Sequence, residues 1–383
     1  MLIRYGTNEK GKRVKIANIY TVDEHGITGD KIDKDAFKII RKLKNAGFDA
    51  YVVGGAVRDL LIGRTPKDFD IVTDAHPRQI KKLFWNARII GRRFRLVHIH
   101  YDEKIIEVST YRGLNPGDEQ NIFGSSLEDD VKRRDFSFNA LYYSPIDEQV
   151  IDYVNGYKDV MHKKITSLIP LDVTFVEDPV RLIRAVKYAA TTGFVVPGKL
   201  KKALKKYSTE LDRVSVSRIT EELLKILASG HSREIFEYCA EYNILQFIVP
   251  KVAENLDDSV LESLERLDNE IENNGGVGRG FMLYSLVRPF LKPPSKAMVK
   301  AKIAFREVFK DAKAVIAPLT PPNIEVEKAV VFYFKELGLP VRSSNNNRGK
   351  KNRNRRGRRP SHKTTKKPNM NNSKVTITTK NES

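Results

Sequence analysis

The stretch YVVGGAVRDLLIGRTPKDFDIVT, residues 51–73, decides the fold class of this chain. A short apolar run ends at Gly54-Gly55 and leads into an amphipathic helical segment. A second apolar run carries the pattern Asp68-x-Asp70. Because side chains alternate faces along a strand, we expect the two carboxylates to project from one face, about 7 Å apart. The stretch therefore predicts a strand–helix–strand unit with one acidic face.

A hard divalent cation such as Mg²⁺ fits this acidic face, because it binds a few carboxylate oxygens and leaves other positions to phosphates and water. Gly54 and Gly55 would let the backbone approach a phosphate closely, and a helix from about Ala56 would direct its N-terminus at the anion. Taken alone, Asp68-x-Asp70 is short and common, and two exposed acids on an edge strand explain it more simply. The glycine pair upstream favours the phosphate and metal interpretation.

Composition places the chain among globular proteins of two or three domains, with 383 residues of which 40% are apolar. No run approaches eighteen apolar residues, so no membrane span is expected. The first thirty residues lack the apolar core of a secretory signal, and we therefore expect a cytoplasmic protein. The single cysteine, Cys239, excludes an intramolecular disulfide and a cysteine-based zinc cluster.

The net charge of +20 is concentrated at the C-terminal end. From Val341 onward, 14 Lys and Arg residues face one acid, Glu382, so this segment carries +13. It has no aromatic residue and little to bury, so residues 341–383 are predicted to be disordered. Such charge suits a polyanion, and we expect residues 343–383 to bind RNA, the alternative being a tail that only increases solubility.

Periodicity divides the rest of the chain. Residues 1–32 are predicted to be an irregular arm, and residues 33–172 a head domain of α+β class with a mixed sheet. After Asp159 the apolar period changes from two to 3.6, which predicts a helical neck at 173–240 and a helical body at 241–340. A break near Leu171 to Glu177 is the predicted head–neck boundary.

The same patterns, together with capping residues, predict the individual helices and strands. Asp33 is predicted to cap the start of a helix that ends near Gly47. The predicted strands are Tyr51–Val53, Phe69–Val72, Phe94–Tyr101 and Ile105–Thr110. The predicted helices are Ala56–Ile62, Pro77–Phe84, Pro179–Thr191, Lys199–Tyr207, Val216–Ala228, Ser232–Tyr242 and Ser259–Ile271. GGVGRG at 275–280 follows a helix and lacks a Lys-Ser/Thr ending, so it predicts a connection between helices and not a phosphate loop.

A third carboxylate is expected near the acidic pair. In the strand 105–110, Glu107 lies on the face opposite Ile106 and Val108, from which it could approach Asp68 and Asp70. A solvent-facing strand glutamate is the alternative. Asp135 is a second candidate for the added charge.

Several blocks in order resemble one known family. GGAVRD followed by DFD is similar to the nucleotidyltransferase head of bacterial poly(A) polymerases and class II CCA-adding enzymes, within the polymerase β superfamily. The resemblance covers about residues 35–240. The further matching blocks are IIGRRFRLVHI (89–99), IIEVSTYRG (105–113), RRDFSFNALYY (133–143), IDYVNGYKD (151–159) and EDPVRLIRAVKYAA (177–190).

The resemblance implies two-metal nucleotidyl transfer, in which metals held by carboxylates activate a 3′ hydroxyl and stabilise the leaving pyrophosphate. Catalytic roles would fall to Asp68, Asp70 and Asp135, and Mg²⁺ would be bound by Asp68, Asp70 and Glu107. The predicted nucleotide-binding residues are Gly54, Gly55 and Arg58 for the triphosphate and Arg134 and Asn139 for the sugar and phosphates. A salt bridge to Asp59 is the alternative for Arg58, and a solvated start of an element is the alternative for the cluster at 133–135.

The block EDPVRLIR predicts a helix start with Asp178 as N-cap and Pro179 at the first helical position. Arg181 and Arg184 are spaced to share a face with Asp178. The resemblance implies that such a face selects the incoming base through protein side chains instead of a template. Capping alone explains Asp178 and Pro179, but it does not explain two arginines on one face.

Two features favour a poly(A) polymerase, which extends RNA 3′ ends with ATP and Mg²⁺, over a CCA-adding enzyme. IIGRRFRLVHI resembles a signature of the bacterial poly(A) polymerases, and the basic tail resembles their C-terminal extension. The segment 113–121 is shorter than the corresponding insertion in many poly(A) polymerases, and in this it departs from the family pattern. CCA addition to tRNA remains the alternative.

Overall fold

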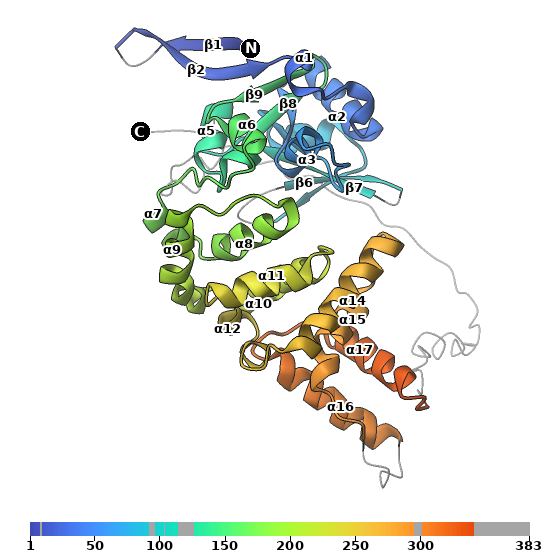
Figure 1. The fold of residues 1–383 in the computed structure, drawn as a ribbon. Helices are drawn as coiled ribbons and strands as arrows, with labels where there is room; N and C mark the ends of the chain where they lie inside the picture. The colour runs from blue at the N-terminus through green and yellow to red at the C-terminus, as the bar shows by residue number, and fades with distance from the viewer. Residues whose placement is uncertain (8–9, 92–95, 103, 114–125, 295–300, 341–383) are drawn as a thin grey trace, which may run out of the picture. The chain divides into compact units, whose positions relative to one another are not determined.

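The computed structural model describes residues 1–340 apart from 8–9, 92–95, 103, 114–125 and 295–300, with the side chain of Ala301 also undescribed. The predicted RNA-binding tail therefore lies outside the described residues, as does most of the short segment 113–121. The described residues fold into a mixed sheet followed by helices (Figure 1), which confirms the α+β head and the all-helical second part.

The head is built on a sheet with the strand order β1-β2-β9-β8-β3-β4-β7-β6-β5 in the described residues. Adjacent strands are antiparallel except β4 and β7, which run parallel. The strands are β1 (Leu2–Thr7), β2 (Arg13–Tyr20), β3 (Ala50–Val53), β4 (Asp70–Thr73), β5 (Ala87–Ile90), β6 (Leu96–Tyr101), β7 (Lys104–Thr110), β8 (Leu141–Ser144) and β9 (Gln149–Asp152).

Strand β3, helix α3 (Gly55–Leu61) and strand β4 confirm the predicted strand–helix–strand unit. Between β3 and α3, Gly54 has φ +76° and ψ −134°, a backbone conformation that favours glycine. The register pairs Val53 with Asp70, so the glycine turn and the start of β4 lie at the same end of the sheet. Asp68 precedes β4, and the prediction of one strand face for both acids is therefore wrong for Asp68.

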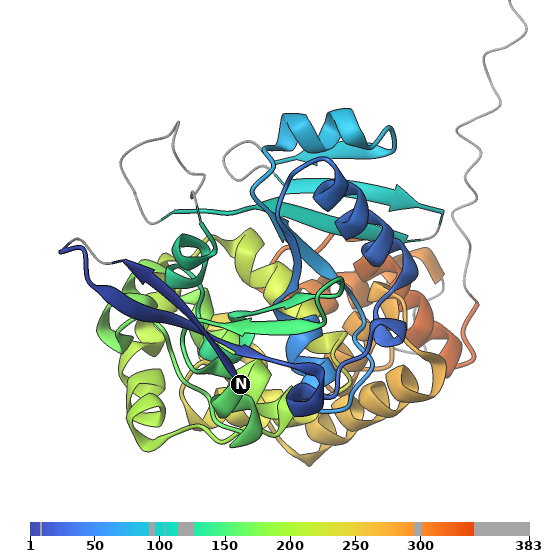
Figure 2. The same cartoon turned by 90° about the horizontal axis from the view of Figure 1, so that it is seen from above.

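The prediction of an irregular arm at residues 1–32 is also wrong. β1 and β2 form a hairpin that joins the sheet through β9, as Figure 2 shows beside the N-terminus, and α1 (Val22–His25) follows. Ile19 pairs with Ile151, and the ring of Tyr20 stacks on that of Tyr157 at 3.9 Å between centroids. The partner that orders this segment lies some 130 residues later in the chain, where local periodicity gives no sign of it.

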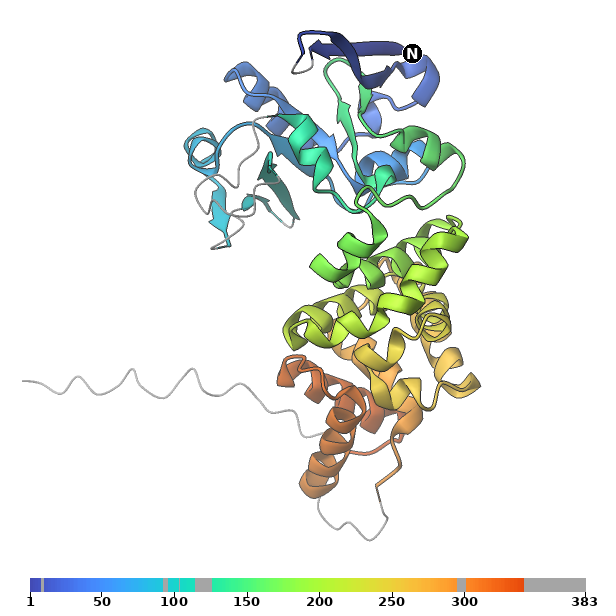
Figure 3. The same cartoon turned by 90° about the vertical axis from the view of Figure 1, so that its left-hand side faces the viewer.

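The remaining helices of the head and neck include the predicted ones, to within a few residues, and three short helices that were not predicted, Leu127–Lys132, Gly156–Met161 and Leu171–Glu177. In the head these are α2 (Lys34–Asn45), α4 (Pro77–Leu83), α5 (Leu127–Lys132) and α6 (Gly156–Met161). In the neck they are α7 (Leu171–Glu177), α8 (Val180–Thr192), α9 (Gly198–Tyr207), α10 (Val216–Leu227) and α11 (Ser232–Glu241). Helices α8, α10 and α11 pack against one another, drawn from green to yellow in Figure 3.

The predicted break at 171–177 is instead helix α7, with Phe175 fully buried in the core. Two prolines bound it, Pro170 at its N-cap and Pro179 beyond its end, and they explain why the segment lacks longer periodicity. Residues 1–341 form one compact unit, in which the core is continuous from the head to the helices.

The body consists of α12 (Leu245–Ile248), α13 (Pro250–Ala253), α14 (Asp258–Asn274), α15 (Arg279–Val287), α16 (Ala301–Ile316) and α17 (Asn323–Glu336). Gly275 ends α14 in the left-handed conformation and α15 begins at Arg279, which confirms GGVGRG as a connection between helices. Within the described ranges, no helix combines the length and apolar character that a membrane crossing needs.

Candidate active site

A cavity of about 500 Å³ brings together the glycine turn, the acidic pair and the first neck helices. From the head it is lined by Gly55, Arg58, Asp68 and Asp70, all of which the sequence predicted to act together. From the helices it is lined by Lys187, Tyr188 and Thr191 on α8 and by Lys225, Ala228, Ser229 and His231 at and after the end of α10. The cavity therefore combines acidic and basic groups from the two parts of the fold.

Three carboxylates influence one another at the head side of this cavity. Incomplete solvation, then the charges of Glu107 and Asp68, raise the pKa of Asp70 to about 6, and Arg134 opposes the shift. Asp70 still keeps an exposed surface, so the surrounding protein reduces but does not prevent its hydration. The parallel pairing of Ile71 with Val108 explains why Glu107 lies near Asp70.

These carboxylates fit the oxygen ligands that Mg²⁺ prefers, and a bound cation would relieve the repulsion that raises the pKa of Asp70. As folded here, however, they do not form a ready-made centre. Over the residues that the structure describes, no group of three or more His, Cys, Asp or Glu side chains is arranged to hold a metal ion. Glu107 instead lies 3.6 Å from His98, Oε2 to Nε2.

Arg58 is buried and held inside the protein. Its Nε and Nη2 donate to Oδ1 of Asp59 at 2.9 and 2.7 Å, and its Nη1 donates to Oδ1 of Asn139 at 3.0 Å. Its guanidinium also lies 5.3 Å from the ring centroid of Tyr188. The salt bridge with Asp59, the alternative from the sequence, is therefore present. Arg58 still lines the cavity, but both it and the Asn139 amide oxygen already have protein partners.

Arg134 is anchored by an acid that the sequence reading missed. Fully buried Asp130 accepts hydrogen bonds from Arg134 Nη2 at 2.7 Å and from the Tyr142 hydroxyl at 2.9 Å, and it also pairs with Arg133. Burial acts to raise the pKa of Asp130, but the two arginines outweigh it and hold the pKa below its ordinary value. Asp130 follows Asp129 in an acidic run at the start of α5, and that run resembles an ordinary solvated helix start.

The Asp130 cluster predicts a specific loss of stability. We expect Asp130→Asn to lower the free energy of unfolding by about 2 kcal/mol, because hydrogen bonds to a charged group become neutral ones while two arginines stay near. Since folding lowers the pKa of Asp130, its stabilisation is present above the unfolded-state pKa and is lost as the pH falls through the lower folded-state value. Urea unfolding of both proteins at neutral and acidic pH measures this, and the difference should shrink at acidic pH. An undiminished difference there would contradict the assigned charge.

Asp135 faces the neck and not the acidic pair. Its Oδ1 accepts from the Phe136 backbone N–H at 2.8 Å, and its Oδ2 lies 2.9 Å from Nη2 of Arg184 on α8. The second contact is an ion pair without good hydrogen-bond alignment. The charges that act on Asp70 include Glu107 but not Asp135. Of the two candidates for a third carboxylate, the geometry therefore favours Glu107.

The predicted face of Asp178, Arg181 and Arg184 is divided. Asp178 is the C-cap residue of α7, and its carboxylate accepts from Arg218 Nη2 at 2.9 Å. Because Pro179 is the N-cap of α8 and no side chain caps that helix, the prediction of Asp178 as N-cap is wrong. Arg181 Nε lies 4.0 Å from Asp178, but Arg181 Nη1 donates to the hydroxyl of Thr174 at 2.9 Å. Asp178 and Arg184 line a second cavity of about 410 Å³, together with Val180, Ser217, Arg218, Glu221, Glu222 and Lys225.

The two cavities share one lining residue, Lys225, which the sequence analysis did not single out. Lys225 pairs with Glu222 on its own helix at 2.8 Å, and Lys187 of α8 approaches the same acid at 3.3 Å. Lys187 lies three residues after Arg184 in the matched block, so helical spacing could have indicated it. Nothing local in the sequence distinguishes Lys225 from a surface lysine.

Two family models match the chain. The model described as the poly A polymerase head domain matches residues 50–166, which contain the glycine turn and the three carboxylates. The model described as the probable RNA and SrmB-binding site of polymerase A matches residues 193–256. The first agrees with the predicted head and the second with helices that follow α8.

Among curated proteins, the chain is 36% identical to poly(A) polymerase I of Salmonella typhi over 312 residues, which cover 75% of this chain and 67% of that protein. It is 35% identical to poly(A) polymerase I of Escherichia coli O157:H7, again over 312 residues that cover 75% of this chain and 67% of that protein. It is also 38% identical to a CC-adding tRNA nucleotidyltransferase of Halalkalibacterium halodurans, but over 202 residues, or 53% of this chain and 50% of that protein.

Solved structures show the same fold. The CCA-adding enzyme of Bacillus stearothermophilus in complex with CTP has a TM-score of 0.53 and 24% identity, covering 80% of this chain and 83% of that one. The CCA-adding enzyme of Thermotoga maritima in complex with tRNA has a TM-score of 0.55 and 23% identity, covering 84% and 77%.

Proposed function

This chain belongs to the poly(A) polymerase family, and we propose that it adds AMP from ATP to RNA 3′ ends without a template. It is a nucleotidyltransferase that acts on RNA 3′ ends. The observation that carries the finer proposal is the extent of the similarity. The match to poly(A) polymerase I runs over 312 residues and includes much of the helical part, whereas the matches to CC- and CCA-adding relatives end after 202 to 218 residues.

CCA addition is the second candidate, because the CC-adding relative has the higher identity over its shorter match. One experiment separates the two activities. The purified chain is incubated with each nucleoside triphosphate in turn, on an oligo(A) primer and on a tRNA that lacks its terminal CCA. Long A tracts on the primer are expected. Addition of C, C and A to the tRNA followed by a stop would assign the alternative.

The described residues have defined tasks in this proposal. The glycine turn offers backbone N–H groups to a triphosphate, and Gly54 adopts the positive φ of +76° that this turn has. Arg58 lines the cavity in which the phosphates would bind, and Asp59 and Asn139 fix its orientation. Arg134 adds positive charge near Asp70, and Asp130 fixes its position.

Asp68, Asp70 and Glu107 are the residues that we propose hold Mg²⁺. When bound, the metal supplies charge neutralisation for the phosphates and lowers the pKa of an attacking hydroxyl. The carboxylates themselves orient the primer end and exclude a second anion from this edge of the cavity. This arrangement explains why three acids lie within electrostatic range of one another although their repulsion disfavours folding.

The basic tail, residues 343–383, is proposed to hold RNA. We expect its deletion to weaken RNA binding and to flatten the salt dependence, because each phosphate contact on a single strand contributes a log–log slope of about −0.7. Fluorescence anisotropy of a labelled oligonucleotide, titrated from low to moderate salt, measures both effects. Activity at saturating RNA should largely survive. An unchanged slope would show that the tail serves something other than RNA.

A further inference from the structure

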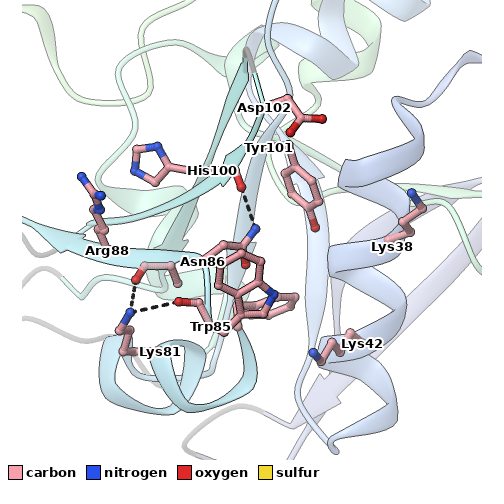
Figure 4. Close-up of a pocket in the computed structure, with 11 residues that line it drawn as sticks. Lys38, Lys42, Lys81, Trp85, Asn86, Arg88, His100, Tyr101 and Asp102 are labelled. Atoms are coloured by element: carbon pink, nitrogen blue, oxygen red, sulfur yellow. Dashed lines mark hydrogen bonds between the residues drawn. The ribbon is translucent and has the colours of Figure 1, made fainter.

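A further cavity of the head lies away from the acidic pair and has no role in the chemistry above. It has a volume of about 560 Å³ and lies between helix α2, the end of α4 and strands β5 and β6 (Figure 4). At its edge stands Trp85, the one tryptophan of the chain, with 90% of its surface exposed. An exposed indole offers a large flat apolar face on which a ligand can pack.

The backbone that carries Trp85 is held firmly. The Asn86 side chain donates to the His100 carbonyl at 2.6 Å, and the His100 backbone N–H donates to the Asn86 carbonyl at 3.2 Å. The Lys81 ammonium group donates hydrogen bonds to the carbonyls of Trp85 and Ala87, drawn as dashed lines in Figure 4. These bonds tie the turn after α4 to the helix. The indole is thus presented from a fixed turn and not from a loose loop.

Positive charge surrounds this indole. Lys38 and Lys42 stand one turn apart on α2, and Lys81 and Arg88 line the other side, against one lining acid, Asp102. Lys38 is paired with Asp35 at 2.9 Å, and Lys81 is engaged with carbonyls. Lys42 and Arg88 have no acidic partner in the described part of the chain. Lys42 lies 4.8 Å above the ring of Phe84 instead, which leaves its charge available to a ligand.

A second feature also points to a ligand. The Nε2 atom of His100, which lines the same cavity, is buried without a hydrogen-bond partner among the described residues. A buried polar atom without a partner destabilises a protein unless something else binds it. A sugar hydroxyl, base edge or phosphate oxygen entering the cavity would satisfy this nitrogen.

We propose that this cavity is an accessory site for single-stranded RNA, in which a base stacks on Trp85 and the neighbouring phosphates bind Lys42 and Arg88. Aromatic platforms flanked by cations are the usual means of holding single strands without sequence preference. The excess of lysine and arginine around the cavity favours a polyanion as the ligand. The flat exposed ring of Trp85 favours a nucleic-acid base over a carboxylate side chain. The inference rests on the proposed action on RNA. The site would hold a part of the strand that is not in the catalytic cavity.

The single tryptophan makes the test direct, because all indole emission reports on this one position. The full chain is titrated with a short oligo(A) in EDTA and without ATP, so that no nucleotide is added. We expect saturable quenching of the emission as a base stacks on the ring. A strand of abasic sugar-phosphates should quench much less. Binding of oligo(A), seen by anisotropy of a label on the strand, with no change in indole emission would overturn the proposal.

Variants then measure the contribution of the site at about 150 mM salt, where nonspecific contacts of the basic tail are weakened. We expect Trp85→Ala to weaken oligo(A) binding about tenfold and Trp85→Phe to restore most of it, because base–aromatic stacking has that order of strength. Lys42→Glu should weaken binding more than Lys34→Glu. Lys34 is an exposed lysine of α2 that does not line the cavity, so this control matches the change in net charge.

The outcomes separate this inference from the proposed function. Circular dichroism should show unchanged folding, since Trp85 contributes little burial. If wild-type protein adds AMP to RNA but Trp85→Ala binds oligo(A) as tightly as wild type, the accessory site is refuted and the proposed function stands. If no AMP is added to any RNA, the proposed function fails, and the quenching experiment still decides the site. Quenching by polyglutamate but not by oligo(A) would overturn the RNA site in favour of an acidic protein segment.

Discussion

Asp70→Asn is expected to reduce AMP addition by about three to four orders of magnitude, a loss of several kcal/mol of transition-state stabilisation. The substitution keeps the size of the side chain and removes the charge on which Asp68 and Glu107 act. Single-turnover incorporation of labelled ATP on a saturating oligo(A) primer measures the effect. Asp68→Asn should act in the same direction.

Folding and RNA binding should survive this change, because Asp70 begins β4 with an exposed side chain and contributes nothing to the core. Removing one member of a mutually repelling group should even raise the unfolding midpoint slightly. Asp212→Asn, at an exposed acid outside both cavities, is a control for the loss of one negative charge. Near wild-type turnover by Asp70→Asn would exclude the proposed metal site.

The strand–helix–strand unit was predictable because its signals are local. The apolar runs, the glycine pair and the two acids all lie within 23 residues, and the structure places the glycine turn and the start of β4 at the same end of the sheet. Strand alternation predicted which face of its strand carries Glu107, but it did not predict which strand would pair with that one. Only the parallel pairing of β4 with β7, which joins residues 37 positions apart, brings Glu107 toward Asp70.

Long-range pairing explains what the sequence could not show. The N-terminal hairpin depends on β9 for its order, and Arg134 depends on Asp130 and Tyr142 for its position. Local capping rules also failed at Asp178. The pattern Asp-Pro before an apolar run predicts an N-cap, yet Arg218 on α10 competes for the carboxylate and binds it. At the hairpin and at Asp178 a contact distant in sequence outweighed a local preference, whereas Arg134 is held by residues four and eight positions away.

Arg184→Ala is expected to lower ATP incorporation by at least about a hundredfold, because it removes the ion-pair partner of buried Asp135 and one wall of the second cavity. If Asp178 and Arg184 read the base, the ratio of kcat/KM for ATP to that for CTP should also fall. A purely structural loss would lower both values equally. Arg184→Lys should restore part of the rate but not the ratio, since lysine keeps the charge without the planar pair of donors.

Arg181→Ala is the matched comparison, because it removes an arginine from the same helix three residues earlier. Its guanidinium donates to Thr174 on α7 and does not line the cavity, so we expect only a small change in rate and none in the ratio. The thermal unfolding midpoint of each variant separates loss of folded protein from loss of function. Equal effects of the two substitutions on the ATP-to-CTP ratio would contradict a base-reading role for Arg184. If Arg184→Ala leaves the ATP-to-CTP ratio unchanged, the role of Arg184 is structural. It then holds α8 against the head through its ion pair with Asp135.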